Sequence, residues 1–409
     1  MYEQPPRPPK DLLLAGGAEG AGCRKGHRTK GENIMEASKV YYTTFRTEVG
    51  RSILDKLKKL VIEAGMDEMD FKNKFTAIKI HFGEPGNLAY LRPNYAKTVV
   101  DVIKKKGGKV FLTDCNTLYV GGRKNALEHL ESAYTNGFNP FTVGCHLMIA
   151  DGLKGTDEVL VPIDGDYVKE AKIGRALRDA DVIISMNHFK GHESTGMGGA
   201  LKNLGMGGGS RAGKMEMHNS GKPLANPEKC ISCGACAKNC AHGGIVFVDK
   251  KATINHDNCV GCGRCIGVCP VDAIHTGWDE ANDVLNKKIA EYTAGVLKDK
   301  EHFHISFIMD VSPNCDCHSE NDMPIIPDIG IFASKDPVAL DLCCAEMVMK
   351  QRANMDSILG DVLKEQGLSG DGGVDYIQIL HPTTNWRAQI EHGVKMGLGS
   401  DKYELIEVE

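Results

Sequence analysis

The sequence predicts an α/β protein with a mostly parallel sheet flanked by helices, made discontinuous by a small inserted α+β module. From Lys39 onward, short apolar runs alternate with amphipathic helical patterns, which is typical of a parallel sheet covered by helices. Residues 223–277 interrupt this alternation with eight cysteines, many glycines and little periodicity. After residue 277 the alternation resumes, so the two flanking parts are expected to form one domain.

The composition limits the class of protein and its partners. The chain has 409 residues, of which 42% are apolar and 25% charged, as in ordinary globular proteins of two or three domains. A net charge of −5, spread along the chain, offers no basic surface for nucleic acid. No apolar run approaches the ~20 residues of a membrane-spanning helix, and residues 12–14 are too short a patch for a secretory signal. We therefore expect a cytoplasmic protein without a membrane partner.

Residues 1–34 are expected to be a disordered leader or extension, since they are rich in Pro, Gly and Arg and lack periodicity. Codons for residues 30–33 could form a purine-rich ribosome-binding sequence directly before Met35. We hypothesise that this segment is leader sequence and that Met35 is the natural start. A genuine flexible tail is the alternative.

Residues 35–222 are expected to form the first part of the α/β domain. Apolar runs predict strands at Thr76–Phe82, Val110–Asp114, Val159–Pro162 and Val182–Met186. Apolar residues at three-to-four spacing predict helices at Val49–Ala64, Asn94–Lys106, Arg123–Asn136 and Tyr167–Ala180.

The inserted module, residues 223–277, contains a duplicated cysteine pattern. Its spacing C-x-x-C-x-x-C-x-x-x-C occurs first at Cys230, Cys233, Cys236 and Cys240, and again at Cys259, Cys262, Cys265 and Cys269. Three thiolates from one tight loop can reach three corners of an iron–sulfur cube, while the fourth points away and ligates the cube of the other half. A zinc ribbon uses two C-x-x-C pairs, and three thiols at this spacing crowd one tetrahedral ion.

The spacing therefore predicts two [4Fe-4S] clusters. One is assigned to Cys230, Cys233, Cys236 and Cys269, and the other to Cys259, Cys262, Cys265 and Cys240. The module closely resembles bacterial two-cluster ferredoxins, with Ala241 where those have the proline found here at Pro270. Its near-neutral charge, five Lys or Arg against four Asp or Glu, suggests that it serves its own chain.

Residues 278–409 are expected to form the second part of the α/β domain. Strands are predicted at Ile305–Asp310, Ile329–Ala333 and Tyr376–Leu380, and helices at Pro337–Lys350, Asp356–Gln366 and Asn385–Met396. Asp336 followed by Pro337 is a favourable N-cap and first-turn pair. These few strands would make a thin separate sheet, which again favours one discontinuous domain.

Polar side chains follow four of the predicted strands. In open parallel sheets, ligands bind beyond the carboxyl ends of the strands, so these side chains are expected to share one rim. They include His81, Glu84, Asp114, Cys115, His188, Lys190, His192, Lys202, Asn203, Asp310, Cys315, Asp316, Cys317 and His318. Among them, Lys202, His188 and His192 are the candidate catalytic residues.

The C-D-C-H run at residues 315–318 has three interpretations. It could bind a further metal ion, because Cys315 and Cys317 can both face one soft ion. His318, with His81, His188 or His192 from neighbouring strand ends, could complete the ligand set. It could instead be a redox-active thiol pair. It could also be a surface loop whose cysteines are close only in sequence.

The glycine-rich run at residues 208–214 imitates a phosphate-binding loop but is followed by Met215, not Ser or Thr, and lacks a preceding strand. Residues 196–214 are therefore expected to be a mobile, anion-tolerant segment leading into the module. No dinucleotide fingerprint is present, so a flavin is a conceivable but unsupported cofactor.

Four motifs carry a resemblance to a known family: N-H-F-K-G-H at residues 187–192, G-A-L-K-N-L-G at 199–205, C-D-C-H at 315–318 and K-D-P-V-A-L-D at 335–341. With them, the chain from Met35 to Glu409 resembles the iron–sulfur centre proteins classed as domain of unknown function 362. The resemblance implies iron–sulfur binding and a redox role. The glycine–Lys202 stretch is also similar to the substrate domain of nickel-dependent lactate racemases, over too short a segment to carry catalysis.

These observations favour an iron–sulfur redox protein whose two clusters pass electrons to a substrate or second cofactor at the strand ends, if an enzyme then an oxidoreductase. Its partner would be a redox protein or a small-molecule electron acceptor. One alternative is an electron carrier or metal-delivery scaffold without its own substrate. A second is a metal-dependent isomerase or hydrolase in which the clusters are structural.

Overall fold

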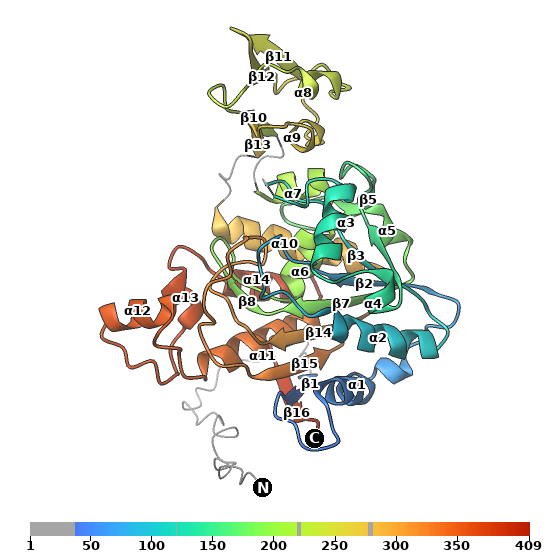
Figure 1. Cartoon of the computed structure of the whole chain (residues 1–409), viewed down its shortest axis with the longest axis vertical. Coiled ribbons are helices and arrows are strands. Elements are labelled where there is room, and N and C mark those ends of the chain that lie inside the picture. The colour runs from blue at the N-terminus through green and yellow to red at the C-terminus, as the bar shows by residue number, and fades with distance from the viewer. Residues whose placement is uncertain (1–36, 120, 219–221, 277–280) are drawn as a thin grey trace, which may run out of the picture. The chain divides into compact units, whose positions relative to one another are not determined.

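A computed structural model describes residues 37–119, 121–218, 222–276 and 281–409 (Figure 1). Its centre is an eight-stranded, mostly parallel sheet flanked by helices. The strands, in their order across the sheet, are β16 (Tyr403–Glu407), β1 (Ser38–Thr44), β15 (Gly330–Ser334), β14 (Glu301–Ile308), β7 (Val182–His188), β2 (Phe75–Ile80), β3 (Lys109–Asp114) and β4 (His146–Ile149). The expected segment at residues 1–34 lies outside the described residues.

Strands from both sides of the cysteine-rich module join in this one sheet. β14, which follows the module, pairs in parallel with β7, which precedes it, and the register places Ile305 opposite Met186. β7 also pairs in parallel with β2, and β2 with β3. β15 is antiparallel to both of its neighbours, β14 and β1. The four neighbouring strands β14, β7, β2 and β3 therefore end at the same edge of the sheet.

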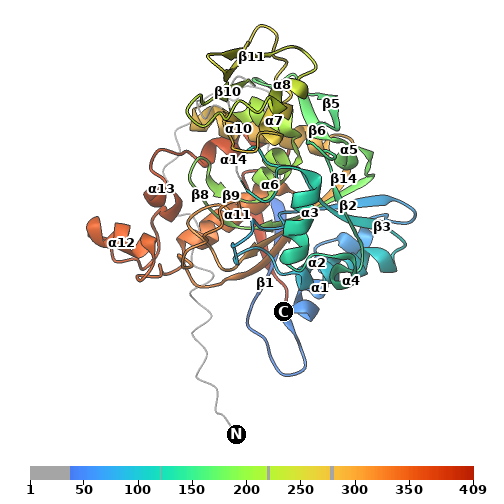
Figure 2. The ribbon, with the colours of Figure 1, turned by 45° about the horizontal axis from the view of Figure 1, so that its top comes forward.

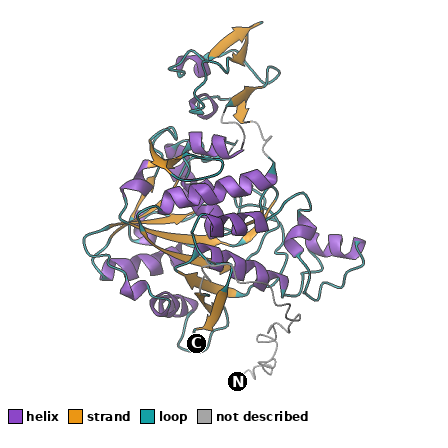
Figure 3. Cartoon of the chain, turned by 180° about the vertical axis from the view of Figure 1, so that it is seen from behind, coloured by secondary structure: helices purple, strands orange, loops and turns teal. Residues whose placement is uncertain are grey.

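The sheet lies between two layers of helices (Figure 3). Alternate residues of its strands face opposite layers, as the two-residue period of a strand requires. In β2, Ile78 packs with one buried cluster and Ala77 with another. The first layer contains α1 (Ile53–Glu63), α2 (Pro93–Lys105), α3 (Ala126–Thr135) and α4 (Pro140–Val143). The second contains α5 (Arg175–Asp179), α6 (Ala200–Gly208), α10 (Asn282–Leu297), α11 (Pro337–Met349) and α14 (Arg387–Lys395).

Shorter elements complete the α/β part. They are the 3₁₀ turn η2 (Met66–Glu68), the hairpins β5 (Glu158–Pro162) with β6 (Glu170–Gly174) and β8 (Lys190–His192) with β9 (Gly196–Gly198), and the helices α7 (Arg211–His218), α12 (Ile358–Glu365) and α13 (Tyr376–Leu380). No helix among the described residues is long and apolar enough to cross a lipid bilayer.

Three local predictions are wrong. Residues 167–180 form β6 and the short α5 instead of one helix. In β6 the buried Ala171 and Ile173 are separated by the more exposed Lys172, as in a strand, and Ile173 pairs across the hairpin with Val159. Residues 376–380 form helix α13 instead of a strand, since Asp375 accepts a hydrogen bond from the backbone N–H of Gln378 and caps a helical turn. Residues 196–214 are not a loop but contain β9, α6 and the start of α7.

The glycines of α6 explain why a glycine-rich segment is helical here. An added Cβ at Gly205 would lie 2.2 Å from the carbonyl oxygen of Ile289 in α10, so the two helices approach too closely for any side chain. Thr293 of α10 also donates a hydrogen bond to the Leu201 carbonyl, 2.8 Å away. Packing against α10 therefore outweighs the low helix propensity of glycine.

Helix α6 lies against α11 (Figure 2), and a buried carboxylate of α11 holds its first turn. Asp341 of α11 accepts hydrogen bonds from the backbone N–H groups of Ala200 and Leu201, at 2.6 and 2.9 Å. Gly199 leaves room for this carboxylate, because an added Cβ would lie 2.3 Å from Asp341 Oδ1. The contact fixes the first turn of the helix that carries Lys202.

The cysteine-rich module is a structural as well as a sequence repeat. Helix α9 (Arg264–Gly267) begins 29 residues after helix α8 (Ala235–Lys238). Strand β13 (Ile274–Thr276) likewise begins 29 residues after strand β11 (Ile245–Val248). The strands β10 (Pro223–Ala225) and β12 (Lys251–Ile254) pair with β13 and β11. Left-handed backbone also recurs at this interval: Ser232 with Gly261, Gly234 with Gly263, and Gly243 with Asp272.

We expect Gly205→Ala to destabilise the fold by about 1–3 kcal/mol, because the added methyl group forces α6 away from α10. Chemical denaturation under anaerobic conditions measures this change. Gly198→Ala is the matched control, since its Cβ would meet only the flexible ends of Lys190 and Lys202, at 3.4 and 3.5 Å. Equal stability of the two variants would contradict the packing argument.

A second prediction concerns pH. Burial raises the pKa of Asp341 from 3.8 to about 7, against the opposing effect of its two N–H donors. The folded protein then keeps a proton that the unfolded chain has released, so stability should fall as pH rises from about 4 to about 7, by at most about 1.4 kcal/mol per unit. Asp341→Asn should flatten this slope in unfolding curves at pH 5 and 7. An unchanged slope would assign the dependence to other groups.

Candidate active site at the strand ends

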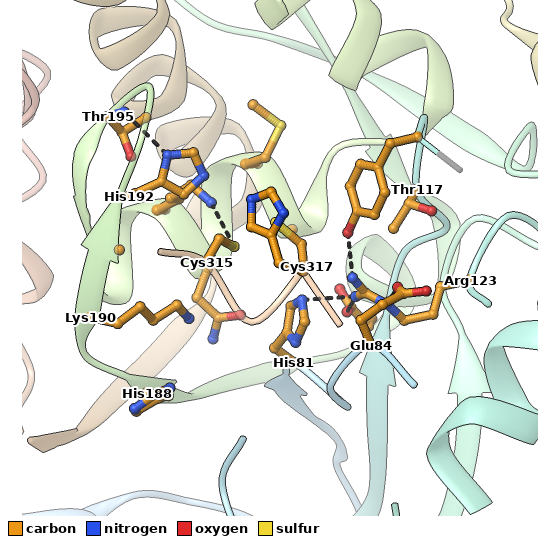
Figure 4. A pocket seen from close by; sticks show the side chains of 18 of the residues that line it. His81, Glu84, Thr117, Arg123, His188, Lys190, His192, Thr195, Cys315 and Cys317 are labelled. Atoms are coloured by element: carbon orange, nitrogen blue, oxygen red, sulfur yellow. Dashed lines mark hydrogen bonds and ion pairs between the residues drawn. The ribbon is translucent and has the colours of Figure 1, made fainter. Parts of the chain in front are cut away.

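A cavity of about 860 Å³ lies beyond the carboxyl ends of the parallel strands. Figure 4 shows part of its lining. The lining includes Lys79, His81, Glu84, Asp114, Arg123, His188, Lys190, His192, Lys202, Lys214, His218, Cys315, Cys317 and His318. The prediction that four strand ends share one rim is thereby confirmed, while the roles of the individual residues stay predictions.

A buried polar contact joins three of the elements at this rim. Lys79 of β2 is 1% exposed and lies 2.9 Å from Asp114 Oδ1, at the end of β3. Lys79 also donates to Asn203 Oδ1 of α6, at 2.7 Å. The Asn203 amide donates in turn to the backbone oxygens of Lys79 and Met186, at 3.1 Å each. Lys202, the neighbour of Asn203, is thus held at a defined place above the strands.

A second group surrounds Arg123. Its guanidinium donates to Glu84 Oε2 at 2.7 Å and faces His81 Nε2 at 2.8 Å. Arginine can only donate, so His81 Nε2 must be the acceptor and is engaged. Burial, and then the charge of Arg123, lower the pKa of His81 well below its ordinary value. His81 is therefore a neutral partner of Arg123, and the structure does not bring it into a ligand group with the C-D-C-H cysteines.

Asp316 fixes the segment between the two cysteines. The segment is a turn, closed by a 3.1 Å hydrogen bond from the His318 N–H to the Cys315 carbonyl. The Asp316 carboxylate lies 2.8 Å from His188 Nδ1 and 3.0 Å from Lys190 Nζ, and all three side chains are almost fully buried. Although burial alone would raise it, these two groups hold the pKa of Asp316 below its usual range.

His188 is a positioning residue in this arrangement. Its Nε2 faces the Met309 carbonyl oxygen at 2.8 Å, and its Nδ1 faces the Asp316 carboxylate. Both partners accept hydrogen bonds, so these contacts fix the orientation of the ring. The catalytic role of His188 stays a prediction.

Cys315 and Cys317 face the cavity beside Lys202. The Lys202 ammonium lies 3.6 Å from Cys315 Sγ. A hydrogen bond from Cys317 and the charge of Lys202 hold the pKa of Cys315 well below its ordinary value, in spite of burial. The same hydrogen bond, with burial, raises the pKa of Cys317 well above it. One thiol of the pair is therefore disposed to be a thiolate and the other to keep its proton.

Two groups of side chains at this site could hold a metal ion. His192, Cys315 and Cys317 form one and Glu193, Cys317 and His318 the other, with ligand atoms within 4.8 Å of one another in each. Of the predicted ligands, Cys317 shares one group with Cys315 and the other with His318, and of the three candidate histidines only His192 joins the two cysteines in such a group. A third group, Asp166, Glu291 and His392, lies elsewhere, where Glu291 accepts backbone N–H groups of residues 166–168.

Cysteines from both repeats of the module lie close together, while their assignment to clusters stays a prediction. Cys230, Cys233, Cys236 and Cys269 line one small cavity. In the other set, Cys259 and Cys262 are electrostatic neighbours of Cys265. The fourth cysteine of each repeat accepts a backbone N–H four residues later, from Gly244 to Cys240 and from Ala273 to Cys269, at 3.2 Å each.

The sequence did not single out Lys79, Arg123, Lys214 or His218 as site residues. Lys79 could have been recognised, because a charged residue inside an apolar, centrally placed strand requires a buried partner. Arg123 and its partners Glu84 and His81 are 39 and 42 residues apart in sequence, and no local pattern connects them. His218 lies one helix away from Lys202, with α7 following α6.

Comparison with known proteins gives the following relationships. The family model described as Domain of unknown function (DUF362) matches residues 76–346. No curated protein matches the chain. The chain is similar to the lactate racemase apoprotein from Thermoanaerobacterium thermosaccharolyticum, with 11% identity and a TM-score of 0.43, over 91% of this chain and 83% of that one. It is also similar to a protein of solved structure from Thermotoga maritima, with 13% identity and a TM-score of 0.37, over 84% of this chain and 58% of that one. Because the family model spans more than half of the sequence, the chain belongs to the DUF362 family.

Proposed function

We propose that this protein is a redox protein that carries two [4Fe-4S] clusters in residues 223–277 and passes electrons to the strand-end cavity. The observation that carries the proposal is the duplicated cysteine quartet, whose 29-residue interval is repeated in the helices and left-handed residues of the module. Each bound cluster would supply one-electron reduction and oxidation. The protein residues hold the clusters, tune them and position what is reduced.

The donor set fits such a group. The four thiols around the small cavity come from three positions of one loop and one position of the other repeat, which is the ligand exchange expected for two-cluster ferredoxins. Backbone N–H groups already point at cysteine sulfurs: Ala252 donates to Cys230 at 3.3 Å, besides the bonds to Cys240 and Cys269. Hydrogen bonds to cluster sulfurs raise the reduction potential.

Arg211 of α7 supports an anionic group at the second loop. Its side chain is fully buried and packs against two glycines of that loop. A Cβ added at Gly263 would lie 2.7 Å from Arg211 Cγ, and a Cβ added at Gly267 would lie 2.1 Å from Arg211 Nη1. Among the described residues, Nε and Nη1 of Arg211 have no hydrogen-bond partner. A buried guanidinium with free donors is costly unless an anion is close. The buried Asp151 carboxylate is one such anion, and Cys265 and Cys262 also interact electrostatically with the guanidinium, so cluster sulfur held by them would be a second.

A route toward the cavity supports electron transfer within the chain. Leu118 lines the cavity and also packs in the buried cluster that contains Cys230, Cys236 and Met215. Lys124, close to Leu118 in sequence, forms a 2.6 Å ion pair with Asp272 of the module. These contacts favour a module that serves the cavity of its own chain over a free electron carrier or metal-delivery scaffold.

A metal-dependent isomerase or hydrolase with structural clusters is the second candidate function. The observation in its favour is the grouping of His192, Cys315 and Cys317, a donor set that suits zinc or nickel. Under this alternative a stoichiometric extra ion would be found, and activity would survive when the clusters cannot change their oxidation state.

Iron content tests the proposal directly. Protein purified without oxygen should contain about eight irons, from two four-iron clusters. The double variant Cys315→Ala, Cys317→Ala should keep them, whereas Cys236→Ser should lose about half or more. Metal analysis with electron paramagnetic resonance of the dithionite-reduced protein gives the result. Iron-free parent protein after anaerobic reconstitution would refute the proposal, and iron loss in the double variant would refute the assignment of the cysteines.

Arg211→Gln should lower the reduction potential of one cluster, because the substitution removes a buried positive charge beside Cys262 and Cys265. We expect a shift of about 60 mV, a tenfold change in the one-electron equilibrium constant, in a redox titration followed by electron paramagnetic resonance. Arg175→Gln, which removes an exposed guanidinium paired with Asp157, is the control and should leave both potentials unchanged. Equal potentials in parent and Arg211→Gln would place the cluster away from Arg211.

A further inference from the structure

We propose that Cys315 and Cys317 form a reversible disulfide, which is the two-electron redox site of the cavity and exchanges with a small-molecule disulfide. The inference deepens the proposed function and rests on it only for the source of electrons. It assigns to the C-D-C-H segment a role in thiol–disulfide chemistry in preference to metal binding.

The backbone brings the two thiols within reach of each other. The hydrogen bond from the His318 N–H to the Cys315 carbonyl, 3.1 Å long, closes a turn in which the cysteines are first and third. A turn shortens the distance between these positions relative to an extended chain, and a disulfide needs Cα atoms less than about 7 Å apart. Both sulfurs lie within one group of ligand atoms less than 4.8 Å apart.

The surroundings hold the turn and favour an attacking sulfur at Cys315. The carboxylate of Asp316, between the cysteines, lies 2.8 Å from His188 Nδ1 and 3.0 Å from Lys190 Nζ. These two contacts fix the position of the turn. Lys202 Nζ lies 3.6 Å from Cys315 Sγ and stabilises negative charge there. The cavity of about 860 Å³ in front of the thiols has room for a small organic molecule.

The hydrogen bonds of His192 count against a metal ion at the same place. Its Nδ1 accepts the backbone N–H groups of Ser194 and Thr195, at 3.1 and 3.2 Å (Figure 4). With Nδ1 an acceptor, the proton of the neutral ring is on Nε2, which can then donate to Cys315 but cannot ligate. Metal binding would require the ring to lose that proton or both backbone hydrogen bonds. Its present arrangement suits a thiol partner.

The reaction balances without a further co-reactant. The Cys315 thiolate attacks a disulfide R–S–S–R, which breaks the S–S bond, forms a mixed disulfide and releases one thiol RSH. The Cys317 sulfur then gives up its proton, attacks Cys315, forms the intramolecular disulfide and releases the second RSH. Because Cys315 starts as a thiolate, one of the two protons on the products comes from Cys317 and the other from solvent. Two electrons, which the clusters would supply when bound and reduced, and one proton from solvent would restore the Cys315 thiolate and the Cys317 thiol.

The experiment uses the holoprotein, equilibrated anaerobically with reduced and oxidised glutathione at several ratios, quenched in acid and alkylated. Trypsin then releases residues 301–335, in which Cys315 and Cys317 are the only cysteines. We expect this peptide to change between a doubly alkylated form and an unalkylated form lighter by two hydrogens. Residues 336–350, with the buried Cys343 and Cys344, are the internal control and should be doubly alkylated at every ratio.

Two variants extend the test. Cys317→Ser should trap a mixed disulfide of glutathione on Cys315, because the resolving thiol is absent. Lys202→Gln should shift the equilibrium about tenfold toward the disulfide, about 30 mV for two electrons, since the ammonium that stabilises the reduced sulfur is lost. Lys364→Gln, which changes an exposed lysine of α12, should leave the equilibrium unchanged.

Double alkylation of residues 301–335 at every ratio would overturn the inference. A stoichiometric zinc, nickel or iron ion that the parent holds and Cys317→Ser loses would also overturn it, and would identify the site as a metal centre. Glutathione sets the state of the pair without the clusters, so failure of the inference is distinguishable from absence of cluster iron measured on the same samples.

Discussion

The arrangement of the cavity depends on a buried contact among Lys79, Asp114 and Asn203. Each comes from a different element, and the contact ties the ends of β2 and β3 to helix α6 at distances of 2.7 to 2.9 Å. An unpaired lysine at this depth would be strongly unfavourable, so the strand ends and the helix can occupy only one relative position. Lys202, next to Asn203, takes its place beside Cys315 as a consequence.

Under the proposed function, the chain would separate electron storage from substrate binding. Cysteine spacing places the proposed clusters in a module of about 55 residues with little apolar core of its own, whereas the cavity belongs to a large sheet with two layers of helices. A small cysteine-rich module can tune potential through hydrogen bonds to sulfur. A rigid sheet edge can hold several charged side chains at fixed distances from a reacting thiol. Combining them in one chain avoids diffusion of a separate carrier.

Much of this organisation follows from the sequence because its signals are local. Spacing within ten residues predicts the cysteine quartets, and apolar runs predict β2, β3, β7, β14 and β15 with the residues at their ends. The edge strands β4 and β16 and the strand β1 next to β16 are not predicted, since strands at and near an edge have a mixed polar pattern such as that of Tyr403–Glu407. Helix α6 was missed because its glycines are explained only by the approach of α10. The partners of Arg123 and His188 were missed because they depend on contacts between distant segments.

The face of the sheet that packs against α6 contains a buried layer of hydrogen-bonded polar side chains. Ser185, Asn187, His304 and Ser306 alternate there with apolar residues, are almost fully buried and form hydrogen bonds among themselves. In such a layer a single replacement leaves its neighbour with an unmet hydrogen bond, while a matched pair of replacements need not. Evolution can therefore alter this layer only by coordinated steps, and related chains should vary there in pairs or not at all.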